Sequence, residues 1–180
     1  MHLITSHDRK GWAVIRCAVL TVSDRCAAGE AEDVSGPVVA EVLETQLVGA
    51  RVVERAVAPD EVAAIQAVVR RWADEGAIAL VVTTGGTGFA PRDRTPEAVR
   101  PLLDREAPGL VVAMLNASLA VTPHAMLSRP VAGLRGRTLI VTLPGSPKGA
   151  RENLETLLPA LPHGLALLGE ASGENQRHEP

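Results

Sequence analysis

The sequence predicts an α/β protein, a three-layer α/β/α sandwich with a mostly parallel central sheet. Short runs rich in valine, leucine, isoleucine and alanine alternate with longer segments of helical spacing. Alternating strands and helices are typical of parallel sheets covered on both faces. A length of 180 residues favours one domain, and a hydrophobic content of 46% is enough for a substantial core.

Three strands and two helices are predicted in the first half of the chain. Residues 13–22 form a short, mostly apolar run rich in valine, as in a strand that is buried on both faces. Residues 50–57 and 78–83 are predicted as two further strands. Residues 34–47 and 59–75 carry apolar side chains at helical spacing, and the second of these is the clearest helix in the sequence.

The second half continues the same alternation. A helix is predicted over residues 95–103, with Thr95 as its N-cap, and another over residues 108–119. Residues 137–143 are predicted as a strand. Residues 146–168 are predicted as a last helical region, which two prolines interrupt.

The predicted domain organisation has three parts: a lead-in over residues 1–12, a single α/β domain over residues 13–168 and a flexible polar tail over residues 169–180. The lead-in lacks a secretory apolar region, and no apolar run reaches the roughly 18 residues of a membrane span. A cytoplasmic location is therefore expected. Cys17 and Cys26 fit neither a redox pair nor a zinc spacing, which favours two buried free thiols.

Charge and composition make some partners improbable. The net charge of −3 argues against general binding to nucleic acid or to a membrane surface. The chain has two tryptophans, one phenylalanine and no tyrosine, so base stacking on aromatic side chains is not favoured either. Neither nucleic acid nor a membrane is therefore expected as a partner.

A glycine-rich segment directly after a predicted buried strand is the most informative feature. Gly85, Gly86, Thr87 and Gly88 follow the strand. Glycine lets the backbone approach a bulky anion, and N–H groups at a bend or a helix N-terminus attract phosphate. Neither a Walker A loop nor a GxGxxG fingerprint is present. The segment predicts a phosphate site, and the alternative is a turn without a ligand.

Two aspartates are candidate magnesium ligands. Asp93 lies in the charged segment after the glycines, and Asp60 lies at the start of the helix predicted over residues 59–75. Mg²⁺ prefers oxygen ligands and keeps several waters. The alternatives are that Asp93 is a surface residue paired with Arg92 or Arg94, and that Asp60 is an N-cap.

Other candidate binding residues follow predicted strands or precede the last one. Ligands in such folds bind beyond the carboxyl ends of the strands, so these segments are expected to converge. An arginine beside a serine suits phosphate, since arginine can contact two oxygens. The alternatives are an ordinary turn for the Ser-Arg pair and a helix cap without a ligand for the last segment. The candidates are Ser23, Asp24, Ser128, Arg129, Gly145, Ser146 and Lys148.

Taken together, these segments resemble one family. Leu20–Asp24, Pro59–Glu61, Thr84–Gly88, Arg92–Glu97, Leu127–Arg129 and Leu143–Pro147 occur in this order. The ordered set resembles the molybdopterin adenylyltransferase family, including the G domains of plant and animal molybdenum-cofactor proteins. The resemblance covers about residues 13–168 and implies a molybdopterin-binding fold that is usually a homotrimer.

The resemblance also implies an activity. It is the transfer of AMP from MgATP to the terminal phosphate of molybdopterin, with release of pyrophosphate. Molybdate insertion follows on another protein or domain, which implies transient contact with it. The functional aspartates of the family fall on Asp60 and Asp93, and its pterin and nucleotide contacts fall on Gly85–Gly88, Ser128 and the Gly145-Ser146 turn. No covalent protein nucleophile is needed, because a substrate phosphate attacks.

Two other functions remain open at this point. One is a non-catalytic molybdopterin-binding or scaffold protein of the same fold. The presence of both Asp60 and Asp93 argues against it. The other is a nucleotide pyrophosphatase on a related fold, which would hydrolyse rather than transfer.

Overall fold

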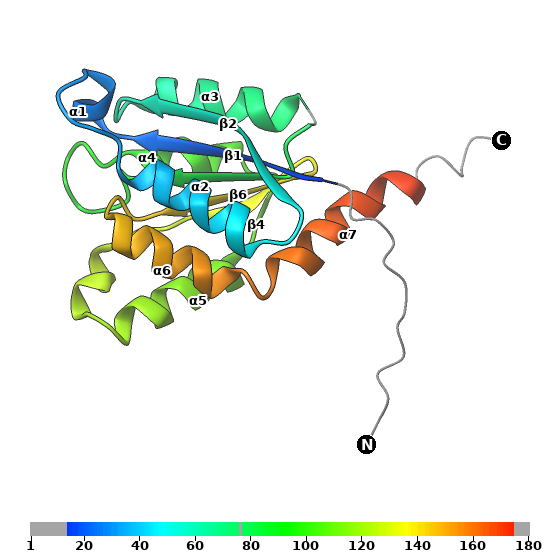
Figure 1. The fold of residues 1–180 in the computed structure, drawn as a ribbon. Coiled ribbons are helices and arrows are strands. Elements are labelled where there is room, and N and C mark those ends of the chain that lie inside the picture. Colours follow the sequence, from blue (N-terminus) through cyan, green and yellow to red (C-terminus); the bar gives the residue numbers. More distant parts are fainter. Residues whose placement is uncertain (1–13, 76, 175–180) are drawn as a thin grey trace.

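The structure is a computed structural model that describes residues 14–75 and 77–174. A six-stranded sheet lies between two layers of helices (Figure 1). The elements in chain order are β1 Ile15–Val22, α1 Asp24–Ala27, α2 Ser35–Gln46, β2 Ala50–Ala58, α3 Val62–Asp74, β3 Leu80–Thr84, α4 Thr95–Val99, η1 Arg100–Leu102, β4 Arg105–Glu106, α5 Pro108–Leu119, η2 Pro123–Leu127, β5 Ala132–Arg135, β6 Thr138–Leu143, α6 Pro147–Leu157 and α7 Leu161–Glu174. The predicted three-layer, mostly parallel α/β class is confirmed.

The sheet has the strand order β2-β1-β3-β6-β5-β4. β1, β2, β3 and β6 are parallel, whereas β5 runs antiparallel to β6 and β4 antiparallel to β5. In Figure 1 the parallel strands point toward α1, so their carboxyl ends lie at one edge of the molecule. Val22 pairs with Ala58, and Thr21 pairs with Thr84, which brings the loops after β1, β2 and β3 together.

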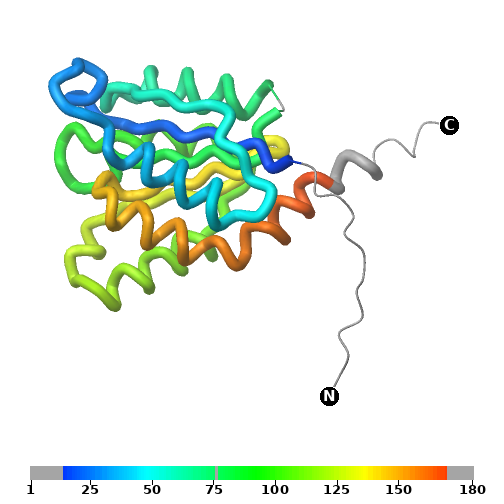
Figure 2. Tube along the Cα trace, in the orientation of Figure 1, coloured from blue at the N-terminus to red at the C-terminus, as the bar shows by residue number. Residues whose placement is uncertain are grey.

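Two cores, one on each face of the sheet, hold the helices in place. Side chains of successive strand residues point to opposite faces: Val19 belongs to the core that includes residues of α2, α5, α6 and α7, whereas Leu20 belongs to the core that includes residues of α3 and α4. The trace in Figure 2 shows α2, α6 and α5 following one another along the first face, and α6 contacts both of its neighbours. Trp72 of α3 is buried in the second core, as its position in the helical stripe requires.

Several elements differ from the sequence prediction. The last helical region is two helices, α6 and α7, because the chain turns at residues 158–160, where a proline interrupts the helical hydrogen bonds. α7 continues to Glu174, past the predicted start of the tail at residue 169, since this segment keeps helix-forming alanine and glutamate. Residues 1–12, which make up the predicted lead-in, and residues 175–180 lie outside the described part of the chain.

Two predictions about single residues are wrong. Thr95 is the first residue of α4 and not its N-cap: the cap position is Arg94, and the Thr95 hydroxyl donates instead to the carbonyl oxygen of Gly85 at 2.8 Å. Cys26 is only partly buried, because α1 lies at the surface above the strand ends. Cys17 is buried as predicted, and burial raises the pKa of its thiol to about 12.

The described helices include none that combines the length and the apolar character of a membrane span.

Candidate active site

A cavity of about 430 Å³ opens at the carboxyl ends of the parallel strands. Its walls come from the loops after β1, β2, β3 and β6 and from the start of α2. The lining residues are Thr21, Val22, Ser23, Cys26, Glu32, Asp33, Val34, Ser35, Asp60, Gly85, Gly86, Asp93, Gly145 and Pro147. The structure therefore brings Ser23, Asp60, Gly85, Gly86, Asp93 and Gly145, all predicted site residues, to one cavity.

Asp60 is held by a reciprocal exchange with Asp24. The backbone N–H of Asp24 donates to Oδ2 of Asp60 at 2.9 Å, and the backbone N–H of Asp60 donates to Oδ1 of Asp24 at 3.0 Å. Asp60 is not the N-cap of α3: that position is Glu61, which makes no side-chain cap bond. The alternative role of Asp60 as the N-cap of α3 is thus wrong, and Asp60 lines the cavity.

The environment of Asp60 disfavours its charge. Partial burial raises the pKa of the Asp60 carboxyl, and the negative charges of Asp24 and Asp93 raise it further, whereas the hydrogen bond from the Asp24 N–H opposes the shift. Like charges that share a site favour protonation of one of them or the arrival of a cation. Asp93, the other predicted metal carboxylate, lines the same cavity.

Asp24 is bound by Arg92 from the loop after β3. Nε of Arg92 donates to Oδ2 of Asp24 at 2.8 Å, and Nη2 donates to Oδ1 at 2.8 Å. These hydrogen bonds, followed by the one from the Asp60 N–H, lower the pKa of the Asp24 carboxyl. Arg92 also lies 3.9 Å from Glu61. The carboxylate of Asp24 is therefore bonded to Arg92 and to the Asp60 N–H, and Asp24 does not line the cavity.

Gly85 and Gly86 have positive φ angles of 104° and 64°, which side chains rarely permit. A Cβ on Gly85 would collide with the carbonyl oxygen of Val22. A Cβ on Gly86 would collide with the Thr95 hydroxyl and lie 2.8 Å from Oδ1 of Asp60. The two glycines therefore let the loop turn back onto β1 beside the Asp60 carboxylate.

Asp93 is fixed within its own loop. Its Oδ2 accepts the backbone N–H of Ala90 at 2.9 Å, and its own N–H donates to the Ala90 carbonyl oxygen at 2.9 Å. Arg92 is engaged by Asp24, and Arg94 is the cap residue of α4. Asp93 is therefore not paired with Arg92, as the alternative would require. A tight turn with Ala90 holds its carboxylate, and Asp93 lines the cavity.

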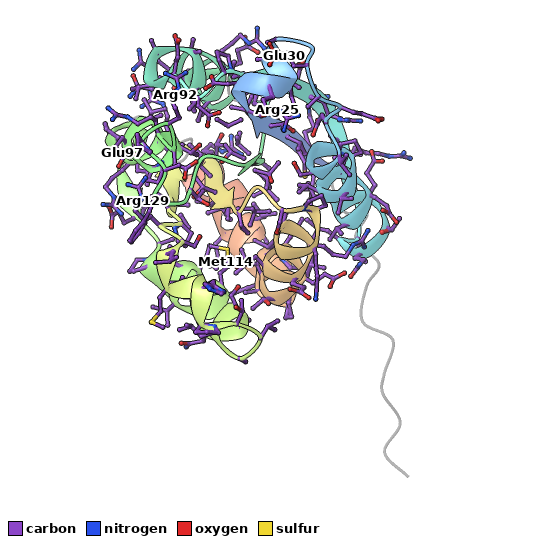
Figure 3. The ribbon with its side chains drawn as sticks, turned by 90° about the vertical axis from the view of Figure 1, so that its left-hand side faces the viewer. Arg25, Glu30, Arg92, Glu97, Met114 and Arg129 are labelled. Atoms are coloured by element: carbon purple, nitrogen blue, oxygen red, sulfur yellow. The ribbon has the colours of Figure 1, made fainter. Side chains whose placement is uncertain are left out.

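Arg129 is located differently from the sequence prediction. Its Nε donates to the carbonyl oxygen of Gly88 at 2.9 Å, its Nη2 donates to the carbonyl oxygen of Asp93 at 2.8 Å, and its Nη1 forms an ion pair with Glu97. Its backbone N–H donates to the Thr87 carbonyl oxygen at 2.8 Å. Figure 3 shows Arg129 beside Glu97, with Arg92 above them. All three guanidinium nitrogens thus bind protein groups. Arg129 holds the glycine loop, residues Gly85–Gly88, from outside the cavity.

Thr87 and Gly88 also lie apart from the cavity lining. Thr87 is 4% exposed, and a Cβ on Gly88 would lie 2.7 Å from Oδ2 of Asp93. They contribute through their carbonyl groups to the contact with Arg129. Their effect on a ligand would pass through the position of Asp93.

A second cavity of about 420 Å³ contains the remaining predicted residues. Ser128, Ser146 and Lys148 line it, with residues of α5, η2 and α6. Ser146 is the N-cap of α6, and its hydroxyl accepts the Gly149 N–H at 3.1 Å. The Lys148 side chain is 79% exposed and lies 3.8 Å from Glu152. The two cavities therefore adjoin at the turn between β6 and α6, where Gly145 lines the first cavity and Ser146 lines the second.

The segment before α2 contributes a residue that was not predicted from the sequence. Asp33 lines the first cavity; its Oδ1 accepts the Gly36 N–H at 2.9 Å, and its Oδ2 accepts the Thr21 hydroxyl at 2.9 Å. An aspartate three residues before a glycine, at the start of a helical pattern, is a capping signal that indicates this position. The position of Asp33 at the cavity depends on its contact with Thr21 of β1, which the local sequence around Asp33 does not indicate.

Comparison with known proteins identifies the family. Residues 18–163 match the family model described as "Probable molybdopterin binding domain". The chain is 42% identical over 154 residues to the molybdopterin adenylyltransferase of Helicobacter pylori strain J99, covering 86% of this chain and 88% of that protein. It is 49% identical over 159 residues to gephyrin of Dictyostelium discoideum, covering 83% of this chain but only 22% of gephyrin. The chain thus spans about a quarter of the length of gephyrin and of the molybdenum cofactor synthesis protein cinnamon of Drosophila melanogaster.

Solved structures show the same fold. The molybdopterin biosynthesis enzyme MoaB from Thermus thermophilus superposes with a TM-score of 0.80 at 53% identity, covering 86% of this chain and 96% of that one. The tungsten cofactor synthesizing protein MoaB from Pyrococcus furiosus superposes with a TM-score of 0.76 at 32% identity, covering 86% and 97%. The chain belongs to the molybdopterin-binding domain family of molybdenum cofactor biosynthesis.

Proposed function

We propose that this protein is a molybdopterin adenylyltransferase, a nucleotidyltransferase that moves AMP from MgATP to the terminal phosphate of molybdopterin and releases pyrophosphate. The observation that carries the proposal is the placement of Asp60 and Asp93 on one cavity with the backbone of Gly85 and Gly86. Relatives named for this activity, 42% identical over most of both chains, support it.

The donor set of the cavity fits a magnesium ion. Its lining includes the carboxylates of Glu32, Asp33, Asp60 and Asp93, and neither lysine nor arginine. No group of three or more acidic, histidine or cysteine side chains that could hold a metal is present among the described residues. A cavity lined by carboxylates but without a closed cluster of three ligands suits Mg²⁺, which is held by one or two carboxylates together with substrate phosphates and water. Asp60 and Asp93 would hold it.

Magnesium bound by these two carboxylates would supply positive charge against the phosphates of both substrates, which otherwise repel one another. The protein supplies the geometry. The exchange with Asp24 orients Asp60, and the turn with Ala90 orients Asp93. Gly85 and Gly86 carry no side chain, so nothing would stand between their backbone and the substrate phosphates.

The reaction then needs no protein nucleophile. An oxygen of the terminal phosphate of molybdopterin attacks the α-phosphorus of ATP, the bond from that phosphorus to the bridging oxygen breaks, and pyrophosphate leaves with the electron pair. Positioning and electrostatic stabilisation account for most of the rate enhancement in such transfers. We assign the phosphates to the cavity of Asp60 and the pterin to the cavity of Ser128 and Ser146, since the two cavities meet at the Gly145-Ser146 turn.

The proposal extends to assembly and location through the family resemblance. We propose a homotrimer in the cytoplasm that transiently contacts the molybdate-inserting protein. Light scattering of the purified chain measures the first of these. A monomer at micromolar concentration would contradict the trimer without affecting the proposed chemistry.

Assay of pyrophosphate and AMP tests the function against its alternatives. Pyrophosphate release that requires molybdopterin and yields adenylyl-molybdopterin supports the transferase. Release of free AMP and pyrophosphate without molybdopterin would indicate a pyrophosphatase. Molybdopterin binding without turnover, at saturating Mg²⁺ and ATP, would indicate a carrier or scaffold protein.

A further inference from the structure

We infer that Arg92 is a positioning residue that joins the loop carrying Asp93 to the loop carrying Asp60, with Asp24 as the link between them. The inference rests on the proposed function, because it concerns the two carboxylates that the function requires. Arg92 itself does not line the cavity.

The link consists of four hydrogen bonds between three loops. Arg92 donates twice to the Asp24 carboxylate, at 2.8 Å from Nε and 2.8 Å from Nη2. Asp24 in turn accepts the Asp60 N–H at 3.0 Å and donates its own N–H to the Asp60 carboxylate at 2.9 Å. Arg92 directly precedes Asp93 in the chain. The loop after β3 is thus tied to the loop after β2 across the end of β1, which lies between them in the sheet.

The exposure of the pair indicates a role in position more than in stability. The Arg92 and Asp24 side chains are 59% and 40% exposed. Exposed ion pairs contribute little to folding free energy, about 0–1 kcal/mol. A two-point contact with a planar guanidinium nevertheless restricts the relative orientation of its partners, and lysine does not reproduce it. Figure 3 shows Arg92 apart from Arg129, and Arg92 binds Asp24, the first residue of α1.

Arg92 therefore complements Arg129 and does not duplicate it. Arg129 fixes the glycine loop against α4 through Gly88, Asp93 and Glu97. Arg92 ties the same loop to Asp24. Loss of Arg92 leaves Asp93 held by Ala90 and Arg129 but removes the connection of its loop to Asp24, and through Asp24 to Asp60.

The test compares Arg92→Ala, Asp24→Ala and the double variant, with Arg94→Ala as the matched control. Arg94 is an exposed arginine in the same loop, and its loss changes the net charge equally. Two quantities are measured: the Mg²⁺ concentration for half-maximal pyrophosphate release, and the calorimetric affinity for Mg²⁺ with a non-hydrolysable ATP analogue.

Arg92→Ala is expected to lower turnover on the order of 10-fold to 10²-fold, the scale of a small misplacement of reacting groups. It is also expected to raise the half-maximal Mg²⁺ concentration and to weaken the calorimetric affinity. The double variant should be no worse than the more impaired single variant, because both changes break one link. Arg92→Lys should recover little, and Arg94→Ala should change neither quantity.

Additive losses in the double variant, or full recovery by Arg92→Lys, would overturn the inference and indicate that Arg92 contacts a phosphate directly or acts only by charge. Equal affinity of Arg92→Ala and the unmodified protein for Mg²⁺ and the analogue would also overturn it. A wild-type protein without transferase activity would refute the proposed function alone, because the calorimetric comparison would still report on the link.

Discussion

Nη2 of Arg129 donates to the backbone carbonyl oxygen of Asp93 at 2.8 Å, although 36 positions separate the two residues in the chain. Through this bond and its contact with Gly88, an arginine in the segment before β5 fixes the backbone of the loop that presents a candidate metal carboxylate. The position of Asp93 thus depends on a residue that does not line the cavity.

Arg129→Lys should therefore lower both stability and turnover. Lysine keeps the charge near Glu97 but cannot reach both carbonyl oxygens, so we expect a loss of about 1–3 kcal/mol in unfolding free energy. Thermal unfolding and pyrophosphate release measure the two effects. A variant with unchanged unfolding and weakened MgATP binding would instead return Arg129 to the role of phosphate ligand that the sequence predicts.

Asp93→Asn keeps the size of the side chain and an oxygen that can accept the Ala90 N–H, but it removes the charge. Adenylyl transfer should fall by a factor on the order of 10² or more, as when a major electrostatic group is lost. Asp104→Asn is the matched control, because Asp104 also accepts a backbone N–H, from Gly136, and does not line the cavity. Similar turnover in both variants at saturating Mg²⁺ would remove Asp93 from the mechanism.

Asp60→Asn should separate stability from activity. The folded protein raises the pKa of Asp60, so its ionised form costs free energy relative to the unfolded chain. At neutral pH the variant should unfold at a higher temperature than the wild type while losing transfer activity. As the pH falls through the raised pKa of Asp60 in the folded protein, the difference in unfolding temperature should shrink, and it should vanish only below the ordinary pKa of an aspartate, where the folded and unfolded chains are both protonated. A less stable Asp60→Asn at pH 7 would show that this interpretation of the site is wrong.

Gly86→Ala should weaken binding of MgATP. The new methyl group would meet the Thr95 hydroxyl and Oδ1 of Asp60, in a backbone conformation with φ of 64°. Gly136→Ala is the control, because Gly136 has φ of 54° but an added Cβ there would meet no atom within 4 Å. Both variants should lose about 1 kcal/mol or more of stability from backbone strain. Only Gly86→Ala should lose calorimetric affinity, by about 1–3 kcal/mol; unchanged affinity would make the loop a turn without a ligand.

Periodicity and turn chemistry predicted the sheet and the helices that cover it. The apolar runs that became β1, β3 and β6 are buried on both faces and need no distant information to be recognised. The antiparallel strands β4 and β5 were missed, because β4 has two residues and β5 contains a glycine. Such short strands at one end of the sheet are defined by their partners and not by their own composition.

The candidate site was predicted in composition more than in contacts. Asp60 and Gly86 meet as expected, because both follow parallel strands. Arg129 binds two backbone carbonyl oxygens besides Glu97, and the Thr95 hydroxyl binds one; no sequence pattern reports the direction of such carbonyl groups. The exchange between Asp24 and Asp60 likewise depends on the register that sets Val22 opposite Ala58.

The strands β2 and β3 both pair with β1 and not with each other. Asp60 follows β2 and Asp93 follows β3, so no single local segment of the chain contains both candidate metal carboxylates. During refolding, catalytic activity would consequently return only after both flanking strands have docked on β1. Recovery of turnover is thus a reporter of the final ordering of the central sheet, and helix content measured by circular dichroism should recover earlier than activity does.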